Sequence, residues 1–149
     1  MGFLSRLFGR ETTDFEQKNS SPETSGELIA EQTNGANLVD GKQTLEYAEE
    51  KKHDIECMKD CCAAELKTMK LTGLVPAPYY FERVAILSRK NKDYKQEIEY
   101  CTSYIDAVED YYTKNDAEKV ADVRKGPRYQ AIVKRLPKAK ELLEKQKAT

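Results

Sequence analysis

The sequence predicts an all-α protein, a small helical bundle of four to five helices with a helical hairpin at its centre. Apolar residues recur at spacings of three, four and seven along each long segment after residue 41, which is the periodicity of one helix face. Residues typical of helix ends, such as Asp93 and Gly73, bound these segments. No segment alternates apolar and polar residues convincingly, so strands are not expected.

The composition bounds the size of the core and shows an uneven charge. The chain has 149 residues, 39% hydrophobic and 34% charged, which suits one domain with one modest core. Residues 11–40 carry seven acids against Lys18 alone, whereas residues 119–149 carry ten bases against three acids. We therefore expect the acidic segment and the basic end to attract one another in a salt-sensitive contact.

Residues 1–40 are expected to precede the folded domain. Residues 1–10 form a short amphipathic peptide whose apolar side comprises Phe3, Leu4, Leu7 and Phe8, and we expect it to contact protein or, less readily, an anionic membrane surface. Residues 11–40 are rich in Ser, Thr, Asn and acids, which predicts a flexible acidic linker with a helical turn near Leu28 and Ile29. Residues 41–149 are then the helical domain.

Three helices are predicted in the first part of this domain. A long helix over residues 42–71 is expected to end at Gly73, because glycine readily takes the left-handed conformation of a C-terminal cap. A second helix over residues 78–90 follows the connector "GLVPA", since proline suits the first helical turn. A third helix is expected to begin after the N-cap Asp93 and to run to about residue 112.

The remainder of the chain predicts a short helix and a longer basic one. The short helix is expected over residues 117–124, before a break at Gly126-Pro127. The last helix contains Pro137, which removes a backbone hydrogen bond and clashes with the preceding turn. We therefore expect a kink or a restart at that residue.

Residues 79–105, "YYFERVAILSRKNKDYKQEIEYCTSYI", resemble one unit of the tetratricopeptide repeat. Phe81 occupies the large aromatic position of the first helix, and Val84 with Ala85 supply the large and small pair that brings the two helices close together. Two residues depart from the pattern, because Ser88 stands where a large residue is preferred and Glu97 stands where a small one is.

A degenerate second copy follows 34 residues later, with Arg128 and Arg135 in place of packing residues. The stretch 73–105 also resembles short bacterial repeat-like proteins, which implies a bacterial or phage source. An isolated unit cannot bury its apolar face, so the flanking helices must act as caps.

The resemblance implies a groove lined by the first helix of the hairpin. On this basis the expected partner-binding residues are Tyr79, Glu82, Arg83, Ile86, Arg89 and Lys90. Glu82 and Ile86 stand where the chaperone-tail-binding subfamily carries Lys and Asn, so a carboxylate clamp is not expected. We expect a non-enzymatic adaptor or inhibitor-like protein that binds another protein, with self-association as a further expectation.

The sequence offers no assembled catalytic set, so no enzyme activity and no cofactor are expected. The lone His53 has no serine or cysteine nucleophile in a recognisable motif, and the glycines form neither a phosphate loop nor a dinucleotide fingerprint. One helix row repeats every four residues and comprises Glu49, His53, Cys57, Cys61 and Glu65. A rigid helix can present only two of these to one ion, so we interpret the row as residues that pack against a neighbouring helix. Metal binding or redox chemistry is the alternative.

The cysteine count and hydropathy favour a reducing cytoplasm. Four cysteines are few for a disulfide scaffold, three of them crowd one predicted helix, and no stretch approaches the length of a membrane span. The leading alternative function is a nucleic-acid-binding accessory protein. Its phosphate-binding residues would be Arg128, Lys134, Arg135 and Lys138 in the basic C-terminal helix.

Overall fold

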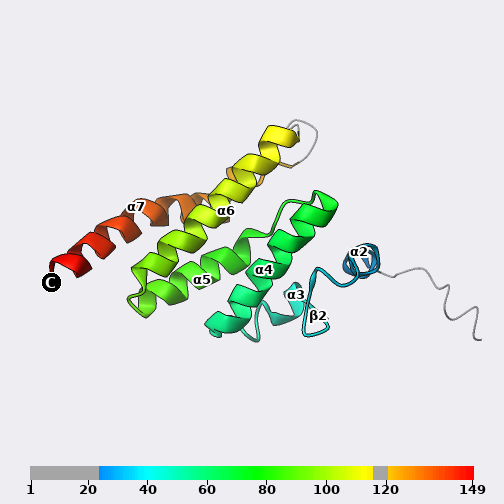
Figure 1. Ribbon diagram of the computed structural model, residues 1–149, viewed down its shortest axis with the longest axis horizontal. Helices are drawn as coiled ribbons and strands as arrows, with labels where there is room; N and C mark the ends of the chain where they lie inside the picture. Colours follow the sequence, from blue (N-terminus) through cyan, green and yellow to red (C-terminus); the bar gives the residue numbers. More distant parts are fainter. Residues whose placement is uncertain (1–23, 116–120) are drawn as a thin grey trace, which may run out of the picture.

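A computed structural model describes residues 24–115 and 121–149, and in these residues the all-α prediction is confirmed (Figure 1). Their β-structure is limited to one short antiparallel ladder, which pairs Leu38 with Gln43. The elements along the chain are α2 (Ser25–Thr33), β1 (Leu38–Val39), β2 (Lys42–Gln43), α3 (Thr44–Tyr47), α4 (Ile55–Thr72), α5 (Pro78–Lys90), α6 (Tyr94–Lys114), the 3-10 helix η1 (Val123–Lys125) and α7 (Pro127–Ala148).

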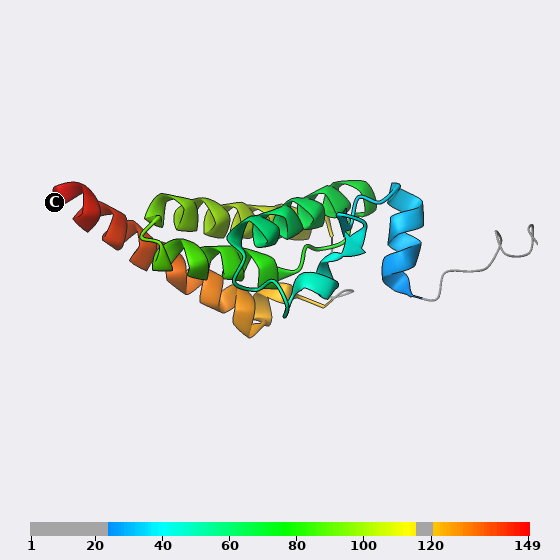
Figure 2. The ribbon, with the colours of Figure 1, turned by 90° about the horizontal axis from the view of Figure 1, so that it is seen from below.

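The four long helices form the bundle, with α5 at its centre. Helix α5 packs against α4, α6 and α7, and α7 packs along both α6 and α5. Turned by 90°, the molecule is elongated, with α2 at one end and the C-terminal turns of α7 projecting past the other (Figure 2). This arrangement places the surface of α5 that α6 does not cover next to α7 and α4.

Capping residues correctly predict the end of α4, the bounds of α5 and the start of α6. Helix α5 spans the predicted residues 78–90, with a proline in its first turn. Asp93 caps α6, because its carboxylate accepts a hydrogen bond of 3.1 Å from the Gln96 backbone N–H. Gly73 ends α4 in the left-handed conformation, with φ 71°, and donates its N–H to the Met69 carbonyl oxygen. These three predictions are confirmed.

The predicted helix over residues 42–71 is wrong in its first part. Residues 42–53 instead form β2, the single turn α3 and a loop, and the long helix begins at Ile55. Asp54 caps this helix by accepting the Cys57 backbone N–H, and a capping residue marks a helix start more strongly than apolar spacing does. Leu45, which lies within the range predicted as helix, is 77% exposed.

Ordered elements occupy residues 24–43, so the range predicted as a flexible linker, 11–40, is corrected from Thr24 onward. The predicted helical turn near Leu28 and Ile29 is confirmed as part of α2. A reciprocal capping box starts α2, because Glu27 N donates to the Thr24 hydroxyl and Thr24 N donates to the Glu27 carboxylate. Asn34 and Gly35 then take left-handed conformations that turn the chain. Residues 1–23, including the amphipathic peptide, lie outside the described residues.

The C-terminal part of the chain differs from its prediction in two places. Part of the predicted helix over residues 117–124 lies outside the described residues, and the part that is described forms η1 rather than an α-helix. Helix α7 runs continuously through Pro137, so the restart, one of the two predicted alternatives, does not occur and the kink stays a prediction. Ile132, five residues before the proline, and Ala139, two residues after it, are both fully buried, so packing holds the helix together across the proline.

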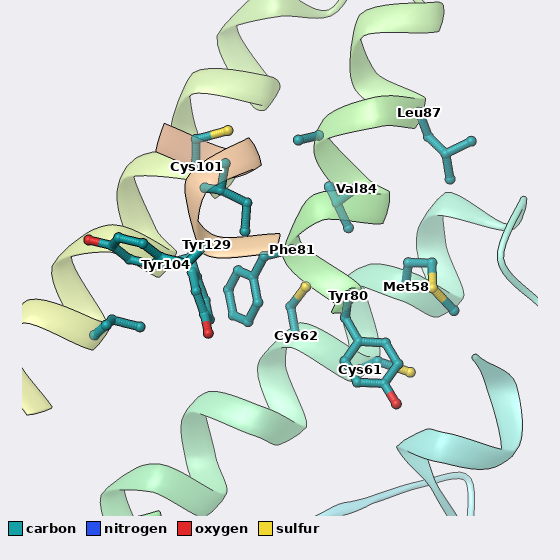
Figure 3. Close-up of a cluster of buried hydrophobic side chains, with 13 residues drawn as sticks. Met58, Cys61, Cys62, Tyr80, Phe81, Val84, Leu87, Cys101, Tyr104 and Tyr129 are labelled. Carbon is teal, nitrogen blue, oxygen red and sulfur yellow. The ribbon is translucent and has the colours of Figure 1, made fainter. Parts of the chain in front are cut away.

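The core joins all four long helices and is rich in tyrosine and cysteine (Figure 3). The Phe81 ring from α5 lies 4.8 Å from that of Tyr104 on α6, measured between ring centroids. The Tyr104 hydroxyl donates to the Pro76 carbonyl oxygen at 2.8 Å, which ties α6 to the connector before α5. Because the polar end of this buried tyrosine has a partner, its ring can be used for packing without a desolvation cost.

Candidate functional site

The predicted protein-binding and phosphate-binding residues meet along the seam between α5 and α7. Arg128 of α7 donates to the Glu82 carboxylate of α5 at 3.0 Å. The same guanidinium lies over the Tyr79 ring, 4.8 Å from its centroid, which is a cation–π distance. The predicted protein-binding and phosphate-binding residues therefore belong to one surface, although Glu82 and Arg128 are 46 positions apart in the chain.

A cluster of charges around one buried carboxylate lies at the other end of this seam. The Glu97 side chain of α6 is fully buried, and Arg89 of α5 donates to it at 3.0 Å and places a second nitrogen 2.9 Å away. Arg135 Nε of α7 lies 3.0 Å from Glu97 Oε2. That N–H is not directed at the oxygen, so this contact is an ion pair without a well-formed hydrogen bond. We call these three residues the Glu97 ion cluster.

Tyr79 and Arg83 attach the loop before α4 to helix α5. The Arg83 guanidinium donates twice to the Lys52 carbonyl oxygen, at 2.9 Å and 2.6 Å, and lies 3.4 Å from His53 Nδ1. The Tyr79 hydroxyl donates to the Ala48 carbonyl oxygen. A guanidinium held at two nitrogens loses little further freedom when it binds a ligand, so these contacts also preorganise the surface.

The remaining predicted residues are less engaged within the chain. Ile86 is half-buried, and Lys90 and Lys134 are exposed. Lys138 is exposed and lies 3.4 Å from Glu141, an exposed pair of the kind that contributes little to stability. Six of the predicted residues make hydrogen bonds or ion pairs within the fold, so they hold the surface in place as well as forming it. They are Tyr79, Glu82, Arg83, Arg89, Arg128 and Arg135.

These residues define a cationic surface, which we call the α5–α7 face. It comprises six bases and three acids, a formal charge of +3, namely Arg83, Arg89, Lys90, Arg128, Arg135 and Lys138 with Glu82, Glu97 and Glu141. Arg128 keeps 49% of its side chain exposed, whereas Glu82 is 14% exposed and Glu97 is buried. Glu82 and Glu97 are thus screened from solvent more than the arginines that pair with them, and the surface should attract anionic ligands.

The cysteines of the predicted helix row lie mainly in the core. Cys61, Cys62 and Cys101 are buried and Cys57 is half-buried, and all four are free thiols. His53 and Glu49, from the same row, are exposed in the loop before α4 and therefore no longer share a helix with Cys57. Across residues 24–115 and 121–149, no group of three or more His, Cys, Asp or Glu side chains is placed to hold a metal ion.

Burial of the thiols predicts a loss of stability at alkaline pH. It raises the pKa of Cys61 to about 12 and that of Cys101 to about 11, and it raises the pKa of Cys62 further. An unfolded thiol ionises near pH 8.5, so above that pH the unfolded chain releases protons that the folded chain retains. Each such thiol should lower the free energy of unfolding by up to about 1.4 kcal/mol per pH unit between about pH 9 and 11.

Guanidinium chloride titrations under reducing conditions from pH 7 to 10.5 would measure this effect. The variant Cys101→Ala should have a shallower decline with pH than the wild type, whatever its stability at pH 7. A free energy of unfolding that stays level up to pH 10.5 would contradict the assignment of buried, protonated thiols.

No protein-family model, curated protein or solved structure matches the chain. Within the part of the chain that the structure describes, no helix combines the length and apolar composition needed to cross a membrane. A feature that the sequence did not indicate is a cavity between α2, β2 and α4, because residues 24–40 were predicted as part of a linker.

Proposed function

We propose that this protein is a non-enzymatic interaction module, an adaptor or inhibitor-like protein, whose α5–α7 face binds an acidic segment of another protein. The observation that supports it is the gathering of six bases on adjoining helices, where the two least exposed acids, Glu82 and Glu97, are already paired to arginines within the fold. An acidic segment would place its carboxylates against these cations, whose partner acids within the fold are shielded from solvent. This arrangement favours binding and raises the association rate.

A protein ligand is favoured over nucleic acid by what lies beside the cations. Tyr79 and Ile86 are half-buried on α5 and offer apolar contacts that a peptide side chain can use. Arg128 and Arg135, two of the four candidate phosphate-binding residues, pair with Glu82 and Glu97. Carboxylates and phosphates would meet these same cations, so the apolar contacts of Tyr79 and Ile86 are what favour a protein ligand.

The repeat-like character of the hairpin is part of this proposal. Phe81, Val84 and Ala85 are buried where α5 and α6 pack, as the repeat pattern would require. The two departures are polar and connected: Gln96 donates to the buried Ser88 hydroxyl at 2.9 Å, and Glu97 joins the ion cluster. Here α7 takes the role of a cap and at the same time completes the binding face.

Charge reversal at Lys90 and Lys138 tests this proposal, because these two residues are exposed and their replacement should leave the fold intact. The double variant Lys90→Glu/Lys138→Glu should retain a partner from the native host at least about fivefold less well, since it loses two exposed attractions of about 0.2–1 kcal/mol and adds repulsion. Nuclease-treated lysate, affinity capture and mass spectrometry would identify the partner, and its affinity would then be measured against salt concentration.

The matched control is Lys67→Glu/Lys70→Glu, which changes the net charge equally at two exposed positions of α4. It should bind as the wild type does. Equal weakening by both double variants would show a general charge effect and contradict the assigned face. Capture that disappears on nuclease treatment would show nucleic acid to be the ligand instead.

A further inference from the structure

A cavity of about 220 Å³ lies beside the point where the described chain begins, on a different surface from the α5–α7 face. Its walls come from α2, β2, α3 and α4 with the following connector, and two of its lining side chains are leucines with large exposed fractions. Leu45 is 77% exposed and Leu74 is 46% exposed. Leu71, 59% exposed, stands one helical turn beyond the lining residue Thr68. Apolar side chains gathered around a hollow in this way mark a binding surface.

The wall of the cavity also contains a polar group suited to a peptide. The Asn37 side-chain nitrogen donates to the Gly26 carbonyl oxygen at 3.0 Å, which fixes the orientation of the amide. Its oxygen, Asn37 Oδ1, is buried and accepts no hydrogen bond from the described residues. A buried acceptor without a donor is costly. Less than 1 Å² of this oxygen is exposed, so a backbone N–H of a docked segment would satisfy it once the wall shifts to open it. A lipid acyl chain offers no such donor.

We propose that this cavity binds the protein's own N-terminal segment, residues 3–8, with Phe3 or Phe8 in the hollow and Leu4 and Leu7 against Leu45 and Leu74. The position of the cavity supports this occupant, because Ser25 and Gly26 line it and residues 1–23 join directly to them. The sixteen residues between Phe8 and Ser25 span at most about 55 Å, so the segment reaches the cavity easily. A tether this short keeps the local concentration of the segment high.

Size and charge agree with this occupant. A cavity of about 150 Å³ is large enough to hold benzene, so 220 Å³ accommodates a phenylalanine ring. Residues 1–10 carry two arginines and no acid, whereas residues 24–47 carry four acids against Lys42 alone. The segment and the elements that would receive it therefore have opposite charge, which favours docking.

Methyl NMR of the full-length protein tests the proposal through the leucines at the rim. In Phe3→Ala/Phe8→Ala, the Leu45 and Leu74 methyl signals should lose their ring-current shifts, while those of the distant core residue Leu87 stay in place. Phe15→Ala is the control, because it removes a phenylalanine that lies between the segment and α2, and it should leave all three leucines unchanged. Reciprocally, Leu45→Asp should shift the Leu4 and Leu7 methyl signals.

Concentration dependence and vesicles separate the other occupants. Ring-current shifts of Leu45 and Leu74 that stay unchanged on dilution support docking within one chain. Shifts that disappear on dilution would assign the cavity to a second copy of the chain and overturn the proposal. Unchanged Leu45 and Leu74 signals in Phe3→Ala/Phe8→Ala would also overturn it. So would perturbation of the Phe3–Phe8 region by phosphatidylserine vesicles alone, with no dependence on Leu45.

Discussion

Replacing Glu97 by alanine is expected to lower the free energy of unfolding by about 3–5 kcal/mol, the range for removing one partner of a buried ion pair. Glu97 is fully buried and faces Arg89 and Arg135, which come from two other helices. Without the carboxylate, the two guanidinium groups would remain close together and would lose the anion that pairs with both, and Arg89 would keep only its hydrogen bond to the Arg135 carbonyl oxygen. For a domain whose total stability is typically about 5–15 kcal/mol, this loss is a large fraction of the total.

Chemical denaturation would measure this effect, and the neighbouring residue provides the control. Glu99 lies on the exposed side of α6, so Glu99→Ala should change stability by no more than about 0.5 kcal/mol. The triple variant Glu97→Met/Arg89→Leu/Arg135→Leu should recover much of the loss, because a buried ion cluster can often be replaced by apolar residues of similar volume. Equal stability of Glu97→Ala and Glu99→Ala would contradict the burial of this cluster.

Replacing Phe81 by alanine should have a similarly large effect, a loss of about 3–5 kcal/mol, for a different reason. The ring is almost fully buried at the centre of the core, with centroids 4.8 Å from that of Tyr104 and 6.4 Å from that of Tyr100. The substitution removes the transfer free energy of the ring and leaves a cavity in which the tyrosines lose packing.

Thermal and chemical denaturation of three variants would isolate this contribution. Phe81→Leu keeps most of the apolar volume and should lose clearly less than Phe81→Ala. Val133→Ala shortens an exposed apolar side chain and should change stability by no more than about 0.5 kcal/mol. A cost for Phe81→Ala no larger than that of Val133→Ala would mean that Phe81 is not a core residue.

The parts of the fold predicted correctly from sequence are those that local chemistry decides. Gly73 and Asp93 act through hydrogen bonds to residues within four positions, and Pro78 sets its own backbone angle. Such signals can be interpreted without knowing the tertiary structure. The same local logic could have found α2, because the Thr24–Glu27 capping box is visible in the sequence, but the polar composition around it favoured a linker.

The features that could not be predicted depend on residues far apart in the chain. Glu97 and Arg135 are separated by 38 positions, and nothing local distinguishes a buried glutamate from an exposed one on a charged helix. The face between α5 and α7 likewise needs the crossing of two helices. Leu45 shows the opposite error, because it lies within the range predicted as one long helix but belongs to α3 and not to α4.

The Glu97 ion cluster also has a consequence for the order of events during synthesis. Arg89 and Glu97 leave the ribosome eight positions apart, so their pair can form as soon as the α5–α6 hairpin closes. Arg135 emerges 38 residues after Glu97, which at about 5–20 residues per second is a delay of roughly 2–8 s. During that interval the carboxylate is open to water on the side that α7 will cover. The nascent hairpin therefore contains no unpaired buried charge, and the Glu97 carboxylate becomes buried only when α7 docks.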